Sequence, residues 1–504
     1  MDRQAHVGPV VRRVVSERRF HLTARDARGG IAARLVVLVA VLTLMSAAAV
    51  YVGQQADKAD SPPRDPPLAS GEPPVLTPRL NLLALPAVKP VLPSAEPGGS
   101  SRVSAPAVRN ALGGTLSSSD LGKHIEFTVA QLGAPKPIVA SRTPQTVTPA
   151  STLKLLTTTA ALKSLGPDHR FLTSVVRGVD PDSLVLLGGG DPLLTDTRPS
   201  VSESSSAPQP AALEDLAKRV VRRLRPSGVR SVTLAYDDSL FSGPAINSTW
   251  EPSYVPESIV SPVGALWVDE GREDPDTAIR VSDPAAVAAS RFAVLLDEQG
   301  LRVRGPVLRG RAPAHAPEVA RVESASLAEI VEHTIENSDN EAAEVLLRHI
   351  ALASGRPGSF EAGLKAMTST LQQSDVDLAG TQIFDGSGLS RRSELPVAAL
   401  VAVLQLTADP QHPRLRSVFS SLPVAGFNGS LADRFTTSAP SGLGLVRAKT
   451  GTLTGVHALA GTVMTRRGSV LLFAVVADQV PIRLTLAARA QLDRVATALS
   501  TCRC

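Results

Sequence analysis

Three short motifs of reactive and polar residues follow one another along the 504-residue chain: Ser151-x-x-Lys154, Ser338-Asp339-Asn340 and Lys449-Thr450-Gly451. A serine hydroxyl becomes an effective nucleophile when a neighbouring base takes its proton, and a lysine amine can be that base. Because residues three apart lie on one face of a helix, Lys154 can reach Ser151. A lysine acts as a base only when it is neutral, and burial or a second cation such as Lys449 lowers its pKa.

The remaining motif residues are suited to the later steps of an acyl transfer. Ser338 can relay a proton to a leaving amine, and Asn340 can hydrogen-bond both a substrate amide and Lys154. Gly451 has no side chain, so the backbone of its strand can come close to an extended peptide substrate. Each motif also has an ordinary structural interpretation, as a helix N-cap, a polar helix turn and a solvated charge at a strand end. Their occurrence together and in this order favours catalysis.

Other catalytic signatures are absent from the sequence. There is no G-x-S-x-G, H-E-x-x-H or Walker motif, and the nine histidines are scattered without the spacing of metal ligands. Gly188-Gly189-Gly190 lacks the Lys-Ser/Thr of a phosphate-binding loop and predicts a tight turn instead. Cys502 and Cys504 are too few for a zinc site, and the sequence leaves their bonding open. We therefore expect no cofactor and no metal.

Predicted strands and helices must bring the motifs together. Extended runs that predict strands occur at residues 124–132, 136–140, 445–450, 459–465 and 469–477. Helical patterns occur at residues 151–163, 327–351 and 484–499. The first motif therefore opens a helix, and the third lies on a strand.

A separate region is expected between the first two motifs. Residues 172–322 contain strand-like segments at 184–187, 231–235 and 278–281, a serine-rich loop and much proline. We interpret this stretch as a mostly β inserted region.

The first 108 residues divide into three parts by composition. Residues 1–34 hold eight arginines and three acidic residues, an excess of five positive charges that equals the formal charge of the whole chain. Residues 35–53 are uncharged and mostly apolar, and residues 54–108 contain 12 prolines. Because positive charge stays cytoplasmic, we expect a basic tail, a single-pass membrane anchor and a stiff stalk outside the membrane. The alternative is a signal peptide cleaved near the small residues Ala47 to Ala49.

The charge balance excludes one class of partner. Everything after residue 34 is net neutral, and aromatic residues make up only 3% of the chain. Binding of single-stranded nucleic acid needs a basic groove and aromatic stacking platforms. We expect no nucleic-acid partner.

The sequence around the motifs resembles one protein family. Four segments are similar to those of the class C low-molecular-mass penicillin-binding proteins, the D-alanyl-D-alanine carboxypeptidase/endopeptidase family: Pro149-Ala-Ser-Thr-Leu-Lys-Leu-Leu-Thr157, Gly188-Gly-Gly-Asp-Pro192, Asp385-Gly-Ser-Gly-Leu-Ser390 and Lys449-Thr-Gly-Thr-Leu-Thr-Gly455. The long gap between Ser151 and Ser338 also fits, because the family inserts extra domains there. The resemblance covers about residues 110–500.

The resemblance implies an α+β fold. The penicillin-recognising domain would be an antiparallel five-stranded sheet flanked by helices, formed by residues 109–171 and 323–504. The inserted region, residues 172–322, would be its second part. The long basic tail, the anchor and the proline-rich stalk depart from the family pattern.

The resemblance also implies a role for each motif residue. Ser151 would be the acylated nucleophile and Lys154 its base, with Ser338 and Asn340 as the second motif. The substrate's terminal carboxylate would be held by Lys449, Thr450 and Thr452. The backbone N–H groups of Ser151 and Thr452 would form the oxyanion hole, and no metal is implied.

We therefore expect a serine-type D-Ala-D-Ala carboxypeptidase that acts on peptidoglycan stem peptides through an acyl-enzyme on Ser151. It could also be a DD-endopeptidase, and β-lactams would be covalent inhibitors. The alternatives are a serine β-lactamase and a non-catalytic cell-wall-binding module on a stalk. The expected location is the cell membrane, held through residues 35–53 with the catalytic domain outside, or a secreted or periplasmic form after signal cleavage.

Overall fold

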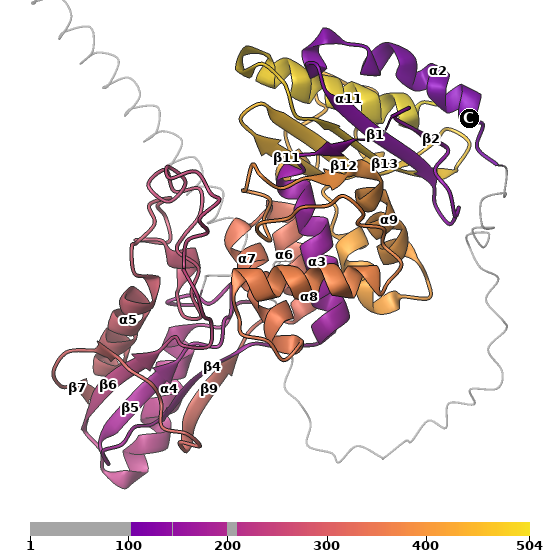
Figure 1. Cartoon of the computed structure of the whole chain (residues 1–504). Helices are drawn as coiled ribbons and strands as arrows, with labels where there is room; N and C mark the ends of the chain where they lie inside the picture. The colour runs from indigo at the N-terminus through magenta and orange to yellow at the C-terminus, as the bar shows by residue number, and fades with distance from the viewer. Residues whose placement is uncertain (1–101, 144, 199–208) are drawn as a thin grey trace, which may run out of the picture. The chain divides into compact units, whose positions relative to one another are not determined.

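The two ends of the described chain meet in one antiparallel sheet (Figure 1). The computed structural model describes residues 102–143, 145–198 and 209–504. The sheet has the strand order β11-β12-β13-β1-β2 and consists of β1 (Ile125–Gln131), β2 (Val139–Ala140), β11 (Val446–Leu453), β12 (Val456–Met464) and β13 (Val470–Ala477). Because β1 pairs antiparallel with β13, the first described strand closes onto the C-terminal hairpin. The structure thus confirms the antiparallel five-stranded sheet, in which β11 is an edge strand.

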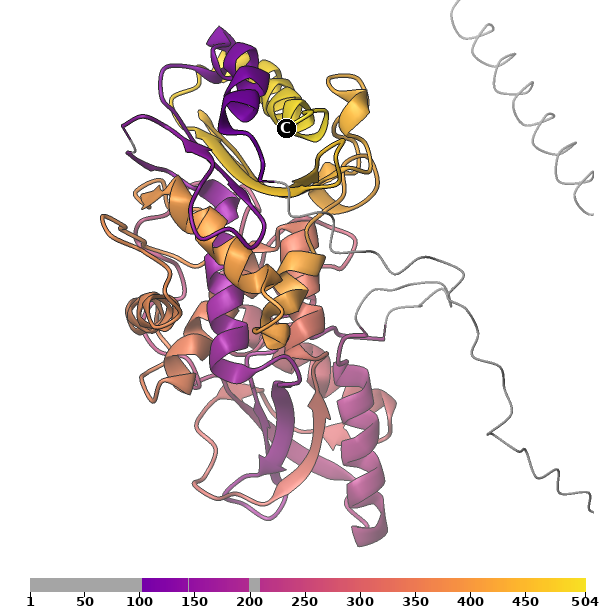
Figure 2. The ribbon, with the colours of Figure 1, turned by 90° about the vertical axis from the view of Figure 1, so that its right-hand side faces the viewer.

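Helices cover both faces of this sheet (Figure 2). One face packs against α2 (Ala105–Leu116) and α11 (Thr485–Ser500). Because side chains alternate along a strand, Leu459 and Phe473 point into that core, whereas Ala458 and Ala460 point into the core on the opposite face. Alanines on the second face let a layer of helices approach the sheet closely.

The second layer surrounds a central helix. Its members are α3 (Lys154–Leu165), α6 (Leu327–Asn337), α7 (Asn340–Ala353), α8 (Phe360–Gln372), α9 (Val397–Ala408) and α10 (Arg416–Ser420). Every residue of α3 from Lys154 to Leu162 is buried. The helix contacts α6, α7, α8 and α9 and therefore lies inside the layer. The lysine of the first motif is thus placed in the protein interior.

The inserted region has its own sheet and core. Its strands are β4 (Leu172–Arg177), β5 (Ser183–Leu187), β6 (Ser231–Asp237), β7 (Arg302–Val303), β8 (Leu308–Arg309) and β9 (Glu318–Glu323). The strand order is β7-β6-β5-β4-β9, and β6 pairs in parallel with β5, β7 and β8. Two helices, α4 (Leu213–Leu224) and α5 (Pro284–Glu298), pack into this core. The inserted region therefore contains helices as well as strands, and the expectation of a mostly β region left out α4 and α5.

Several predicted elements differ in detail from the structure. The helix predicted over residues 327–351 is two helices, α6 and α7, which are interrupted at Ser338 and Asp339. The strand predicted at residues 278–281 is wrong, because only Arg280 forms an isolated bridge there. The short strands β3 (Thr146–Val147) and β10 (Leu395–Pro396) form an additional pair.

The N-terminal predictions fall largely outside the described residues. These are the basic tail (1–34), the apolar segment (35–53) and most of the stalk (54–108), although α2 begins at Ala105, inside the last residues assigned to the stalk. None of the helices in the described ranges is both long enough and apolar enough to cross a membrane. At the other end of the chain, Cys502 and Cys504 form a disulfide with each other.

Candidate active site

Ser151 lies in the turn that opens the central helix, and Lys154 is the first residue of that helix. Residues Ala150–Leu153 form a 3-10 turn that leads directly into α3. The Nζ of Lys154 lies 3.0 Å from the Oγ of Ser151, 2.8 Å from the Oδ1 of Asn340 and 2.8 Å from the carbonyl oxygen of Ser387. The last two atoms can only accept, so they take two N–H groups of the amine. A neutral Lys154 then has its lone pair free for the hydroxyl proton of Ser151.

Burial makes the neutral form of Lys154 accessible. The side chain is completely buried, and this lowers its pKa from 10.5 to about 8, even though the carboxylates of Asp339 and Glu344 act in the opposite direction. Burial, and after it the positive charge of Lys154, also lower the pKa of Lys449. Repulsion between two cations is mutual, so each charged amine disfavours the charged form of the other.

The carbonyl that accepts from Lys154 belongs to a tightly held loop, residues 385–390. The buried carboxylate of Glu344 accepts from the backbone N–H of Gly386 at 3.0 Å and of Ser387 at 2.8 Å. The carboxylate of Asp385 accepts from Trp250 Nε1 at 2.9 Å and from the backbone N–H of Ser390 at 2.6 Å. Sequence reasoning identified this loop only through the family resemblance, and it missed Glu344 and Trp250.

Two glycines let neighbouring segments press against the residues before Ser151. A Cβ on Gly388, whose φ is 82°, would lie 2.0 Å from the carbonyl oxygen of Ala150. A Cβ on Gly451 would lie 2.8 Å from the carbonyl oxygen of Pro149. Ala150 itself has a φ of 48°, a left-handed conformation that L-residues rarely adopt. The structure therefore shows a close approach of Gly451 to the turn that carries the nucleophile, and its approach to a substrate stays a prediction.

The second motif occupies the break between α6 and α7. Ser338 ends α6 with a φ of 62°, and Asp339 begins α7 by accepting from the backbone N–H of Ala342 at 2.9 Å. Asn340 bridges two parts of the site, because it accepts from Lys154 and donates its Nδ2 to the carbonyl oxygen of Ile259 at 3.0 Å. The hydroxyl of Ser338 makes no hydrogen bond with any other described residue.

The third motif lies within the edge strand β11. Lys449 is completely buried and donates to the carbonyl oxygen of Thr450 at 3.1 Å. The hydroxyl of Thr450 donates to the Oγ of Ser430 at 3.0 Å, a neighbour that sequence reasoning missed, and Thr452 is exposed. Strand β11 packs against the turn that carries Ser151. Direct hydrogen bonds therefore join Ser151, Lys154 and Asn340. Lys449 belongs to the same site because its strand packs against the Ser151 turn and because the charge of Lys154 acts on it.

The sequence and the fold of this chain are similar to those of known proteins. Residues 108–278 and 272–499 match the model of the D-Ala-D-Ala carboxypeptidase 3 (S13) family. The carboxypeptidase DacB of Mycolicibacterium smegmatis is 33% identical over 479 residues, which cover 94% of this chain and 97% of the relative. The crystal structure of penicillin binding protein 4 from Haemophilus influenzae has a TM-score of 0.62 at 20% identity and covers 79% of this chain and 98% of its own. The same Haemophilus protein complexed with a β-lactam has a TM-score of 0.56 at 20% identity, with coverages of 78% and 98%.

Replacing Glu344 with alanine is expected to loosen the 385–390 loop. The change leaves the buried N–H groups of Gly386 and Ser387 without an acceptor, so we expect the free energy of unfolding to fall by about 3 kcal/mol. Denaturant titration of wild type, Glu344→Ala and Glu361→Ala measures this. Glu361 is exposed on α8, and its removal should have almost no effect. Equal stability of the two variants would contradict the assigned role of Glu344.

Proposed function

Because the chain belongs to the D-Ala-D-Ala carboxypeptidase 3 (S13) family, we propose that it cleaves the terminal D-Ala-D-Ala bond of peptidoglycan stem peptides through an acyl-enzyme on Ser151. The observation that carries this proposal is the pairing of Lys154 Nζ with Ser151 Oγ at 3.0 Å in a site where burial lowers the lysine pKa to about 8. The fold, an antiparallel sheet with helices on both faces, is that of the penicillin-recognising proteins.

The first half-reaction transfers the peptide to the enzyme. Ser151 Oγ attacks the carbonyl carbon of the penultimate D-Ala while Lys154 takes the hydroxyl proton. The backbone N–H groups of Ser151 and Thr452 hold the oxyanion that forms. When the C–N bond breaks, the amine of the departing D-Ala receives a proton through Ser338. The result is an ester on Ser151 and a free D-Ala.

The second half-reaction releases the shortened peptide. A water molecule attacks the ester carbonyl and gives one proton to the neutral Lys154, which passes it to the Ser151 oxygen as that oxygen leaves. The products are the free enzyme and the carboxylic acid of the shortened stem peptide, which loses its proton to the solvent. Every step uses side chains and backbone groups of the chain itself.

Lys449, Thr450 and Thr452 bind the substrate's terminal carboxylate in this proposal. Burial and the charge of Lys154 lower the pKa of Lys449, so a bound carboxylate would favour its protonated form. The β11 strand is at the edge of its sheet, which suits an extended peptide laid alongside it. This arrangement favours a substrate with a free carboxyl end over an internal peptide bond.

The same attack explains why β-lactams would be covalent inhibitors. A β-lactam offers Ser151 a strained amide, and the structurally similar Haemophilus protein has been crystallised in complex with a β-lactam. Cleavage of cross-links as a DD-endopeptidase would use the same residues on a longer substrate. A serine β-lactamase would instead turn penicillin over quickly, and a non-catalytic wall-binding module would form no covalent adduct.

We propose further that residues 35–53 hold the protein in the cell membrane, with the catalytic domain outside. The proposal rests on the apolar, uncharged composition of this segment and on the arginines that precede it. The proline-rich stretch 54–108 would then separate the catalytic domain from the membrane surface.

Covalent labelling tests the nucleophile. Incubation of the full-length protein with a fluorescent penicillin should label the wild type, and the label should persist well after the free penicillin is removed. Ser151→Ala should be labelled at least about 100-fold more slowly than the wild type, because the attacking oxygen is gone. Ser369→Ala, a matched change at an exposed position on α8, should label normally. Rapid loss of the label would indicate a β-lactamase, and labelling of Ser151→Ala would refute the assignment.

The pH dependence of acylation tests the base. Lys154 must be neutral to accept the proton, so the second-order rate constant for acylation should rise with pH and level off above about 8. Well below that pH the rate should fall about tenfold per pH unit. Stopped-flow or quench measurements between pH 6 and pH 9.5, about 1.5 to 2 units on each side of the inflection, provide the profile. A flat profile over this range would exclude Lys154 as the titrating base.

The membrane anchor is tested on the mature protein. Cell fractionation should place the protein in the membrane fraction, and mass spectrometry of its N-terminus should find residues 1–53 still attached. A mature N-terminus shortly after Ala47 to Ala49 would show that the segment is a cleaved signal peptide.

A further inference from the structure

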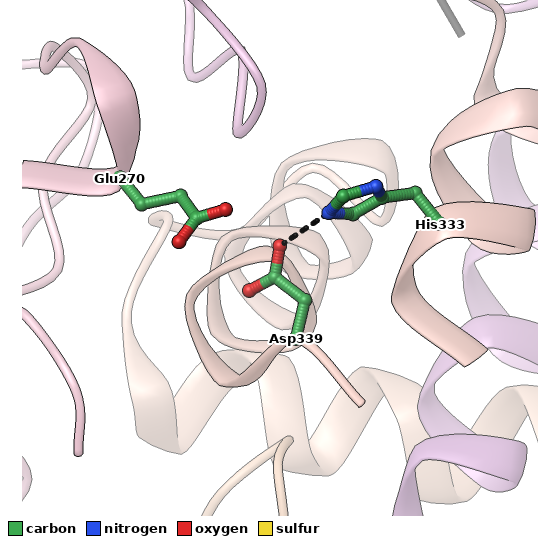
Figure 3. A group of neighbouring side chains, drawn as sticks. All are labelled: Glu270, His333 and Asp339. Carbon is green, nitrogen blue, oxygen red and sulfur yellow. Dashed lines mark ion pairs between the residues drawn. The ribbon is translucent and has the colours of Figure 1, made fainter. Parts of the chain in front are cut away.

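Three side chains from distant parts of the sequence converge behind the second motif (Figure 3). Glu270 comes from the short turn Asp269–Gly271 of the inserted region, His333 from α6, and Asp339 from the first residue before α7. One ligand atom from each residue lies within 4.8 Å of the other two, and His333 Nε2 is 3.4 Å from Asp339 Oδ2. A nitrogen and two carboxylate oxygens thus face one point.

The carboxylate of Asp339 is only half satisfied. Its Oδ1 accepts from the backbone N–H of Ala342 at 2.9 Å. Its Oδ2 is buried and accepts no hydrogen bond from the rest of the described chain, and the side chain as a whole is only 4% exposed. A desolvated carboxylate oxygen is unfavourable unless a cation or a donor meets it. In Figure 3 this carboxylate lies between His333 and Glu270.

The neighbouring arginines neutralise other carboxylates. Arg272 Nη2 is 2.7 Å from Glu270 Oε2, and Arg280 Nη2 is 2.8 Å from Glu341 Oε1 and 3.6 Å from Glu270 Oε2. No guanidinium group of the described residues forms an ion pair with Asp339. The two arginines therefore pair with Glu270 and Glu341, and the ion-pair partner of Asp339 among the described residues is the imidazole of His333.

We propose that Glu270, His333 and Asp339 bind a Zn²⁺ ion, with water in the fourth position. Imidazole nitrogen and carboxylate oxygen are ligands of Zn²⁺ at about 2.0–2.2 Å, and three protein ligands plus water form a common tetrahedral set. Two such bonds place ligand atoms about 3.4 Å apart at a tetrahedral centre, close to the His333–Asp339 separation. Glu270 is 20% exposed and can rotate the remaining distance. Mg²⁺ and Ca²⁺ prefer six or more oxygen ligands, which this site does not offer.

The metal would fasten the inserted region to the second motif without touching the reacting atoms. Glu270 lies in the segment that also supplies the carbonyl oxygen of Ile259 to Asn340 and the backbone N–H of Ser261 to Glu341. Asp339 directly precedes Asn340, which binds Lys154. A cation at this point would fix the segment of Ile259 relative to Asn340 and so keep the Asn340–Ile259 hydrogen bond in place. Glu270, His333 and Asp339 would therefore position Asn340 without contacting the substrate. The proposed metal site stands independently of the proposed reaction.

Calorimetric titration with Zn²⁺ alone tests the site. The full-length protein is prepared without a polyhistidine tag and stripped with a chelator, and circular dichroism checks that each variant is folded. Loss of even an outer-shell partner weakens metal binding about 10–100-fold. His333→Gln and Glu270→Gln remove direct ligands, so each should weaken one Zn²⁺ site by at least about 10-fold. Asp339→Asn should do the same and still cap α7, since asparagine is also a good N-cap.

A matched histidine variant and a spectroscopic probe complete the experiment. His412 lies outside the cluster and caps no helix with its side chain, so His412→Gln should bind Zn²⁺ like the wild type. Co²⁺ in the same site should give the visible absorption of a four-coordinate ion in the wild type but not in His333→Gln. Saturating Zn²⁺ should raise the Tm of the wild type by a few degrees and that of His333→Gln by less. Unchanged Zn²⁺ affinity in His333→Gln would overturn the proposal and leave His333 as an ion-pair partner of Asp339.

Discussion

The catalytic half of the molecule is organised around one buried amine. An unsatisfied polar group in a protein core costs several kcal/mol, so Lys154 is tolerated at full burial only because it has hydrogen-bond partners in Ser151, Asn340 and Ser387. Each partner is in turn held by other contacts: Ser151 by the glycine-lined turn, Asn340 by Ile259, and Ser387 by Glu344. Burial therefore fixes the geometry and lowers the basicity of the amine at the same time, and a single constraint serves both structure and chemistry.

Local patterns in the sequence were sufficient for much of this fold. The strands β1, β2, β12 and β13 and helix α11 depend on neighbouring residues, and each was predicted within a few positions. The Ser151–Lys154 pair and its contact with Asn340 were also predicted. The interruption at Ser338 was missed because α6 and α7 continue one helical pattern across it. Helix α4 was missed although its apolar positions Leu213, Leu216, Val220 and Leu224 repeat at helical spacing.

Contacts between distant segments could not be obtained in this way. Glu344 is a charged residue within a helical pattern, and only the fold shows that it is buried against the backbone of the 385–390 loop. Trp250 and Ile259 lie in the stretch interpreted as an inserted region, yet Trp250 packs in the catalytic core and both reach the site. Glu270 and His333 are 63 positions apart, so no ligand spacing in the sequence could indicate that they meet. Some residues that belong to the inserted region by their position in the sequence therefore pack with the catalytic part.

The pairing of β1 with β13 constrains how the protein can be made. During synthesis, β1 and its short neighbour β2 emerge early, but β1 must wait for more than 300 further residues before β13 exists to pair with its other edge. Until then that edge of β1 is unpaired, a state prone to aggregation and to recognition by chaperones. A chain cut short before β11 would also lack the whole third motif. Peptidase activity can therefore arise only after the β12–β13 hairpin has emerged, and a nascent polypeptide that ends before this hairpin stays inactive.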